Sequence, residues 1–146
     1  MQNQIIIRES NDSDIYEIAQ LMVELGYPTT NEDMVERMKR IQLNADYKTI
    51  VAIYNNELAG MIGLIKNLFW ERNGHYIKIQ ALVVKLSFRR KGIGELLIKS
   101  AEKWAKEIGA HSLSLNCGNK KERNEAHKFY PGVGFQLISS GYYKEI

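Results

Sequence analysis

The sequence predicts a mixed α+β fold, in which a central sheet of about six to seven strands carries helices on both of its faces. Three observations lead to this prediction. β-branched and aliphatic stretches alternate with amphipathic helical stretches along the chain. Short turns join the early strands, which predicts an antiparallel meander. A helix separates later strands, which predicts parallel neighbours joined by a crossover.

Length and composition limit the possible classes of protein. The 146 residues, 45% hydrophobic and 25% charged, are typical of one globular domain spanning residues 1–146. A net charge of +3, with basic and acidic residues interleaved, argues against a general nucleic-acid binder. The single cysteine, Cys117, forms no internal disulfide. No run reaches the length of a membrane span and no secretory signal opens the chain, so we expect a complete cytoplasmic protein.

The first half of the chain contains a strand, two helices and a hairpin. Asn11–Asp14 supplies N-cap residues for the first helix, and Gly26–Pro28 ends it. Gly60 and Gly63 lie inside a strand, which predicts a bulge or a close backbone approach. The predicted elements of this half are a strand at Ile5–Glu9, helices at Ile15–Leu25 and Asn31–Ile41, and strands at Lys48–Tyr54 and Leu58–Leu68.

The second half opens on a well-buried strand, because Ile77–Val84 is β-branched and aliphatic. Trp70–Gly74 forms the turn before it. Pro131 and Gly132 are expected to stop the last helix. The predicted elements of this half are the strand Ile77–Val84, a helix ending near Ile108, a strand at His111–Asn116, a helix at Glu122–Tyr130, and a closing hairpin of Phe135–Ile138 and Gly141–Lys144.

A basic, glycine-containing turn links that buried strand to the following helix. It reads Arg89-Arg90-Lys91-Gly92-Ile93-Gly94. The unpaired N–H groups of a helix N-terminus attract anions, and glycine lets a phosphate approach them, so the turn predicts a phosphate or pyrophosphate site. The lysine precedes the glycines, which excludes a P-loop, and the third glycine of the dinucleotide fingerprint is Leu97. An ordinary glycine turn with a solvated basic face is the alternative.

A second motif, A-x-x-F-Y-x-x-x-G-F at Ala126–Phe135, follows after an intervening strand. Together with V-V-x-x-x-x-R-x-x-G-x-G at Val83–Gly94, it resembles the GNAT superfamily of acetyl-CoA-dependent N-acetyltransferases. The resemblance covers essentially the whole chain, because the order of elements also fits. G-M-I-G-L at Gly60–Leu64, Q-A-L-V-V at Gln80–Val84 and A-H-K-F-Y at Ala126–Tyr130 resemble the aminoalkylphosphonate type of small-molecule acetyltransferase, and aminoglycoside acetyltransferases are a further possible subclass.

The resemblance implies acetyl-CoA as the acetyl donor, no metal, and roles for particular residues. Tyr130 would protonate the departing thiolate, since a phenol, whose ordinary pKa is about 10, is a suitable donor. A buried packing tyrosine is the alternative. The N–H of Val83 would stabilise the oxyanion. The residues implied in cofactor binding are Leu82, Val83 and Val84 for the pantetheine arm, Arg89, Arg90, Lys91, Gly92, Ile93 and Gly94 for the pyrophosphate, and Asn124 from the last helix.

The sequence departs from this family at the general base. Many relatives place a glutamate on the central strand, where this chain has Lys78, Gln80 and Ala81. Either another group acts as the base, or the amine arrives neutral. Lys78 is a solvated strand residue, or it attracts an anionic substrate. The other candidate bases are Glu24, Glu71 and His75.

Several functions remain open at this point. The expected partner is a small-molecule amine, with no nucleic acid and no membrane, and an exposed closing hairpin would allow a homodimer. The alternatives are an acyl-CoA-binding module with little catalysis and an acetyltransferase of protein N-termini or lysines. The three histidines are isolated in the sequence, so no metal site is predicted.

Overall fold

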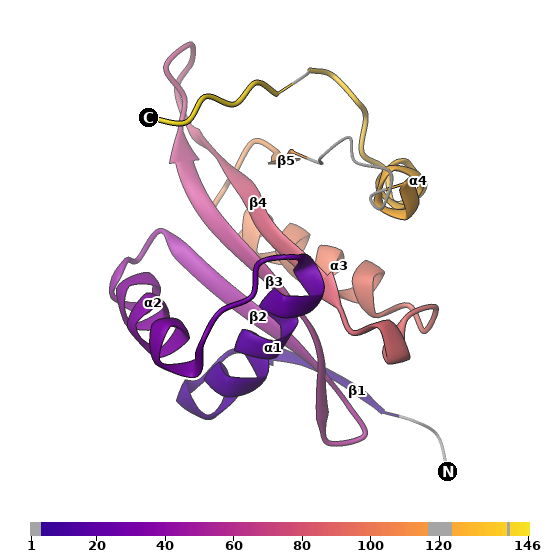
Figure 1. Ribbon diagram of the computed structural model, residues 1–146. Coiled ribbons are helices and arrows are strands. Elements are labelled where there is room, and N and C mark those ends of the chain that lie inside the picture. The colour runs from indigo at the N-terminus through magenta and orange to yellow at the C-terminus, as the bar shows by residue number, and fades with distance from the viewer. Residues whose placement is uncertain (1–3, 117–123, 140) are drawn as a thin grey trace. The chain divides into compact units, whose positions relative to one another are not determined.

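The computed structural model describes residues 4–116, 124–139 and 141–146. The chain divides into two compact units, Met1–Ser114 and Leu115–Ile146, so the expectation of a single domain stays a prediction. The elements in chain order are β1 (Ile5–Glu9), η1 (Asp12–Asp14), α1 (Ile15–Leu25), α2 (Asn31–Leu43), β2 (Tyr47–Tyr54), β3 (Glu57–Leu68), β4 (His75–Val84), η2 (Leu86–Phe88), α3 (Ile93–Glu107), β5 (Leu113–Leu115) and α4 (Asn124–Gly132) (Figure 1).

The sheet has five strands in the order β1-β2-β3-β4-β5. The first four form the predicted antiparallel meander. The chain then crosses over through α3 and returns beside β4, where the amide of His111 donates to His75 O and the amide of Ile77 donates to Ser112 O. From the first bond to the second, the residue numbers increase along both segments, as they do in a parallel pair. The sheet is therefore mixed, as predicted.

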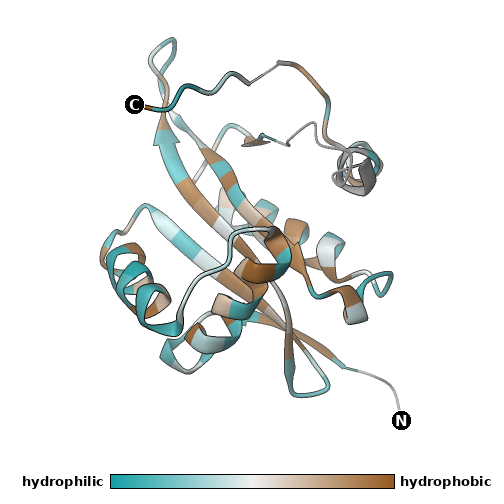
Figure 2. Cartoon of the chain, viewed as in Figure 1, coloured by the Kyte–Doolittle hydropathy of each residue, from teal (hydrophilic) through white to brown (hydrophobic). Residues whose placement is uncertain are grey.

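Helices cover both faces of this sheet. α1 and α2 lie on one face and α3 on the other (Figure 1). The apolar residues gather on the central strands and on the helix sides turned toward them (Figure 2). Strand alternation divides the core, because Val51, Met61 and Val83 pack with α1 and α2, whereas Ile77 and Ile79 are buried outside that cluster.

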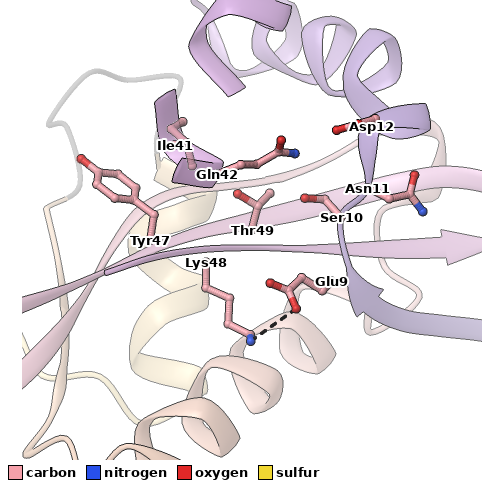
Figure 3. Close-up of a pocket in the computed structure, with 9 residues that line it drawn as sticks. All are labelled: Glu9, Ser10, Asn11, Asp12, Ile41, Gln42, Tyr47, Lys48 and Thr49. Atoms are coloured by element: carbon pink, nitrogen blue, oxygen red, sulfur yellow. Dashed lines mark ion pairs between the residues drawn. The ribbon is translucent and has the colours of Figure 1, made fainter. Parts of the chain in front are cut away.

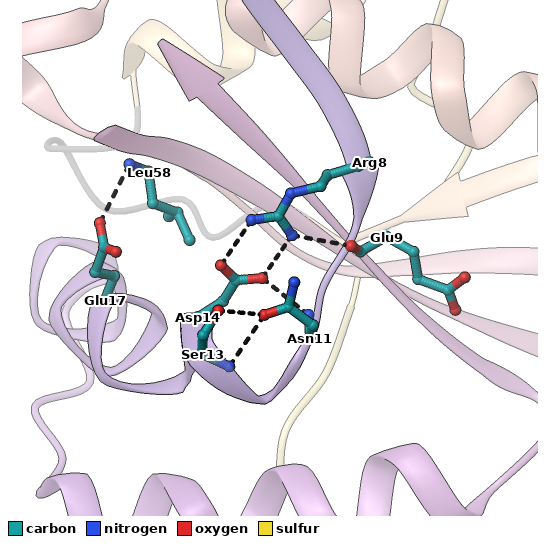
Figure 4. Close-up of polar contacts among 7 residues, drawn as sticks. All are labelled: Arg8, Glu9, Asn11, Ser13, Asp14, Glu17 and Leu58. Atoms are coloured by element: carbon teal, nitrogen blue, oxygen red, sulfur yellow. Dashed lines mark hydrogen bonds and ion pairs between the residues drawn. The ribbon is translucent and has the colours of Figure 1, made fainter. Parts of the chain in front are cut away.

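Polar contacts fasten α1 to the sheet. Arg8 on β1 makes two bonds to the buried Asp14 carboxylate, of 2.7 and 2.9 Å, and Asp14 also accepts the amide of Asn11 (Figure 4). Asn11 and Asp14 form a capping box around the short turn η1, which leads directly into α1. The N-cap residue of α1 itself is Asp14, whose side chain caps no amide of α1. Farther along the helix, Glu17 accepts the amide of Leu58 at 3.2 Å. These contacts hold α1 and its N-terminal turn against β1 and β3.

The two strand glycines mark close contact and irregular pairing, as predicted. A Cβ on Gly60 would lie 2.8 Å from the carbonyl oxygen of Val83. The pairing of β2 with β3 shifts next to Gly60, and the pairing of β3 with β4 shifts next to Gly63. The second shift leaves Gln80 as the extra residue of β4. Beyond such a bulge, the other set of alternate residues directs its backbone N–H and C=O groups to the neighbouring strand.

The prediction of six to seven strands was wrong in number. The part of the chain that the structure describes contains five strands, and the expected hairpin of residues 135–138 and 141–144 is irregular backbone in its described residues. Alternation of a few apolar and polar residues is a weak signal for a strand, because pairing with a neighbour decides whether a strand forms.

The prediction that Pro131 stops the last helix was also wrong. Pro131 lies inside α4, and the helix ends in a Schellman motif centred on Gly134, whose φ is +97°. The amide of Phe135 donates to Tyr130 O at 3.0 Å, and the amide of Gly134 donates to Pro131 O at 3.2 Å. Glycine reaches this left-handed conformation without a Cβ clash, so Gly134 provides the stop.

Candidate functional site

The basic turn of residues 89–94 forms the N-terminus of α3. Gly92 is the N-cap residue in the left-handed conformation, with φ +79°, and no side chain caps this end of the helix. The first intrahelical bond runs from the amide of Leu96 to Gly92 O at 3.1 Å. The amides of Ile93, Gly94 and Glu95 therefore precede the hydrogen-bonded part of the helix and are oriented as anion donors. Arg90 also has a positive φ, +64°.

The end of β4 presents backbone groups in two directions. Met61 pairs with Val83 and Gly60 with Val84, and the amide of Lys85 donates to Ala59 O at 2.8 Å. Alternate residues of an antiparallel pair face the neighbouring strand, so Val83 and Lys85 direct their N–H and C=O groups to β3. Leu82 and Val84 direct theirs away from β3. The expected oxyanion donor at Val83 is thus corrected, because its amide belongs to the β3–β4 ladder.

The turn and the strand end are joined by a side chain. Arg89 Nε donates to Val84 O at 3.2 Å. Since that carbonyl points away from β3, the arginine binds one of the outward groups of the strand. The amide of Arg89 bonds Leu86 O at 3.3 Å, so both its backbone and its side chain fold back on the preceding segment. The sequence-predicted residues of β4 and of the basic turn are brought together here.

Glu24 lies at this same end of the molecule. Its Oε2 accepts the amide of Leu86 at 3.0 Å, which joins the last turn of α1 to the segment that follows β4. It was one of the three candidate bases. The hydrogen bond from Leu86 indicates a structural role for Glu24, whose carboxylate holds the segment between β4 and the basic turn. No local sequence signal marks that role, because 62 positions separate the two residues.

The other two candidate bases lie near the opposite end of β4. His75 is the first residue of the strand, about 30 Å from Val84 at the usual rise per residue, and its Nε2 bonds Ile108 O at 2.8 Å. Glu71 is exposed in the turn that precedes β4. Neither residue lies close to the outward groups of Leu82 and Val84 along the strand.

Polar groups lie on β3 and β4, on the strand face opposite to Ile77 and Ile79. Asn67 Nδ2 contacts the hydroxyl of Tyr76 at 3.4 Å across the β3–β4 pair. Lys78 lies two residues beyond Tyr76 and so shares its face. Asn67, Tyr76 and Lys78 are all half-buried, whereas Gln80 in the bulge is exposed. The face thus offers a cation, a phenol and an amide next to Ala81.

The C-terminal unit places Tyr130 between two rings. Its ring centroid lies 5.3 Å from that of Phe129 and 5.7 Å from that of Phe135, and both pairs are edge-to-face. Asn124 is the first residue of α4, and its side chain lies outside the described residues, as does Cys117. Tyr130, the acid expected from the sequence, thus makes both of these ring contacts at the end of its own helix.

A separate cavity of about 350 Å³ lies between the ends of β1 and α2 and the start of β2. Ser10 and Thr49 line it, while the ion pair of Lys48 with Glu9 points to the other side of the strands (Figure 3). Its lining contains no residue of β3, β4 or α3. The cavity is thus distinct from the basic turn.

The described residues form neither a metal site nor a membrane-spanning helix. Among them, no group of three or more His, Cys, Asp or Glu side chains is placed to hold a metal ion. Within that same part of the chain, every helix is too short or too polar to cross a bilayer.

Comparisons with known proteins identify the family of the chain. The model of the "Acetyltransferase (GNAT) family" matches residues 13–135. The aminoalkylphosphonate N-acetyltransferase of Salmonella typhimurium is 30% identical over 129 residues, which are 88% of this chain and 80% of that protein. A crystal structure of a GNAT family acetyltransferase from Staphylococcus aureus is 32% identical, with a TM-score of 0.83 over 97% of this chain and 98% of that chain.

A more distant structure shares the fold. An aminoglycoside N-acetyltransferase in complex with CoA has a TM-score of 0.85 over 100% of this chain and 97% of that chain, at 14% identity. At that identity the likeness concerns the fold alone.

Proposed function

The chain belongs to the GNAT family of acetyltransferases, and we propose that it transfers an acetyl group from acetyl-CoA to the primary amine of a small molecule, which attacks directly in a ternary complex. The observation that carries the proposal is the uncapped N-terminus of α3, with Gly92 in a left-handed conformation and basic residues beside it. That end of the helix suits a pyrophosphate.

The residues at this end of the sheet fit the donor. The amides of Ile93, Gly94 and Glu95 would receive the pyrophosphate, and Arg89, Arg90 and Lys91 would add positive charge. Leu82 and Val84 offer outward backbone groups, which pantetheine amides can bind as an added strand would. Val83 pairs with β3 and so holds Leu82 and Val84 in place beside the pantetheine arm. Asn124 would donate a hydrogen bond to the cofactor from α4. The amide of Leu82 or of Val84 takes the oxyanion role first expected of Val83.

The thioester supplies the reactive carbonyl, and this chain supplies orientation and a proton. The amine nitrogen forms a bond to the acetyl carbon, and the bond from that carbon to sulfur breaks. The thiolate then takes the proton of the Tyr130 hydroxyl, and the proton lost by the amine passes to solvent or to a base. No carboxylate lies on β4 between Lys78 and Val84, so we propose that the amine reaches the site in its neutral form.

For the acceptor we propose an amine that also carries an anionic group, such as a phosphonate or a carboxylate. Lys78, Tyr76 and Asn67 form a face suited to oxyanions. A nearby cation also disfavours the ammonium form of the substrate, which helps to deliver a neutral amine. The similarity to an aminoalkylphosphonate N-acetyltransferase supports this class.

The test is release of CoA from acetyl-CoA, measured with a thiol reagent across aminoalkylphosphonates, amino acids, polyamines, aminoglycosides and short peptides. We expect turnover with anionic small amines, and a loss of about a hundredfold or more in kcat for Tyr130→Phe. Lys144→Met, an exposed change in the same unit, is the control.

Other outcomes identify the alternatives. Tight binding of acetyl-CoA without turnover on any amine would favour an acyl-CoA-binding module. Turnover confined to peptides would favour a protein acetyltransferase. Absence of acetyl-CoA binding would contradict the proposal itself.

A further inference from the structure

A buried tyrosine on β2 contacts the segment of the basic turn at two residues, Phe88 just before the turn and Lys91 within it. Tyr54 is the last residue of β2 and is 8% exposed. Its ring centroid lies 5.3 Å from that of Phe88, and the ammonium group of Lys91 lies 5.2 Å from it. One ring therefore contacts the residue before Arg89 and the residue after Arg90.

The backbone between these two contacts is in an unfavourable conformation. Arg90 has a φ of +64°, a region that costs a residue with a Cβ roughly 1–2 kcal/mol. Such conformations persist only where the surrounding contacts hold them. Gly92 follows with a φ of +79°, and the left-handed residues direct the turn into the helix N-terminus. The contacts of Phe88 and Lys91 lie on either side of the strained residue.

Tyr54 can hold the turn because pairing with strands on both sides fixes its own backbone. It ends a strand that pairs with β1 on one side and β3 on the other, at Ile5 and Glu57. The next two residues, Asn55 and Asn56, form the left-handed hairpin turn. The tyrosine is thus set by the sheet, while Phe88 and Lys91 belong to the connecting segment.

We infer that Tyr54 is a positioning residue, which holds residues 88–91 in the conformation that binds the pyrophosphate of acetyl-CoA. This inference rests on the proposed function. The contact with Lys91 also restrains a flexible cation near the helix N-terminus, so less conformational freedom is lost when the anion binds. Tyr54 itself needs no contact with the reacting atoms.

The experiment compares a donor with the pyrophosphate and a donor without it. Calorimetry gives the Kd of CoA, and thiol release gives kcat/KM for S-acetylpantetheine, which lacks the pyrophosphate and the nucleotide. We expect Tyr54→Leu to raise the Kd of CoA about tenfold, while kcat/KM for S-acetylpantetheine stays within about twofold. Tyr54→Phe keeps the ring and should match the wild type. Tyr47→Leu, at the first residue of the same strand, is the matched control.

The outcomes separate this inference from the function on which it rests. Equal CoA affinity in wild type and Tyr54→Leu, or parallel losses with both donors, would overturn the positioning role and leave the function standing. Failure of the wild type to bind CoA would overturn both. Thermal unfolding shows whether Tyr54→Leu folds. Where it does not, Phe88→Leu removes one of the two contacts, and a loss of about threefold in CoA affinity is expected, with no loss overturning the inference.

Discussion

Phe135 contacts Tyr130 twice, because its amide donates to the Tyr130 carbonyl at 3.0 Å and its ring lies 5.7 Å from the Tyr130 ring. The two residues occupy the positions that meet in a Schellman motif, where an apolar contact accompanies the backbone bond. The motif F-Y-x-x-x-G-F therefore has a structural reason. Gly134 turns the chain so that the final phenylalanine packs on the tyrosine proposed as the proton donor.

Loss of the Phe135 ring should reduce turnover through Tyr130. We expect Phe135→Leu to lower kcat by about two- to tenfold, in line with the strength of an aromatic pair, and Phe135→Tyr to retain activity. Steady-state kinetics with acetyl-CoA and the best amine give the values, with Leu137→Ala as an exposed control. In the Tyr130→Phe background the same change should add little. A full additional loss there would show that Phe135 acts independently of the hydroxyl.

The two glycines of β3 should respond differently to alanine. A Cβ on Gly60 would lie 2.8 Å from Val83 O, whereas a Cβ on Gly63 would make an ordinary contact of 3.7 Å with Ala81. We expect Gly60→Ala to lower the free energy of unfolding by about 1–3 kcal/mol, because backbone must move. Gly63→Ala should be neutral or stabilising by up to about 1 kcal/mol. Urea denaturation measures both, and equal effects would contradict the contact at Gly60.

Asp14 should make stability depend on pH in the acid range. The hydrogen bond from Arg8 is the main cause that holds the pKa of Asp14 below its usual value, and it outweighs the opposing effect of burial. A lowered folded pKa gives stability that is present above the unfolded pKa of about 3.9 and is lost as pH falls through the folded value. We expect the free energy of unfolding to decline below about pH 4.

Removal of the charge tests that assignment. Asp14→Asn should lower stability at neutral pH by about 1–3 kcal/mol, as expected for hydrogen bonds to a charged group, and should flatten the acid decline. Denaturation at a series of pH values compares it with Asp12→Asn, a control in the same turn. An unchanged acid decline in Asp14→Asn would assign the pH dependence to other groups.

Lys78 should determine selectivity for the acceptor. We expect Lys78→Met to raise the KM of anionic amines about tenfold, the size of one charge-assisted hydrogen bond, and to leave neutral amines and acetyl-CoA nearly unchanged. Lys66→Met is the matched control, since Lys66 pairs with Ile77 on the neighbouring strand and points to the opposite face. Equal losses for anionic and neutral amines would remove Lys78 from recognition.

Elements that local chemistry specifies could be predicted from the order of residues alone. The basic turn, the capping residues Asn11 and Asp14 and the antiparallel meander follow from residue types at short spacing, as does the order of strands and helices. The two paired motifs identified the family for the same reason, since each is read within about a dozen residues.

Features that depend on residues far apart in the chain became visible only in the folded protein. The outward direction of Leu82 and Val84 follows from their register with β3, and the bulge at Gln80 sets that register. Glu24 meets Leu86, and Tyr54 meets Lys91, only because packing brings α1 and β2 to the end of β4. The closing hairpin failed as a prediction because a strand needs a partner, which a short apolar pattern does not specify. Pairing and packing are relations between segments, so they became visible only in the folded chain.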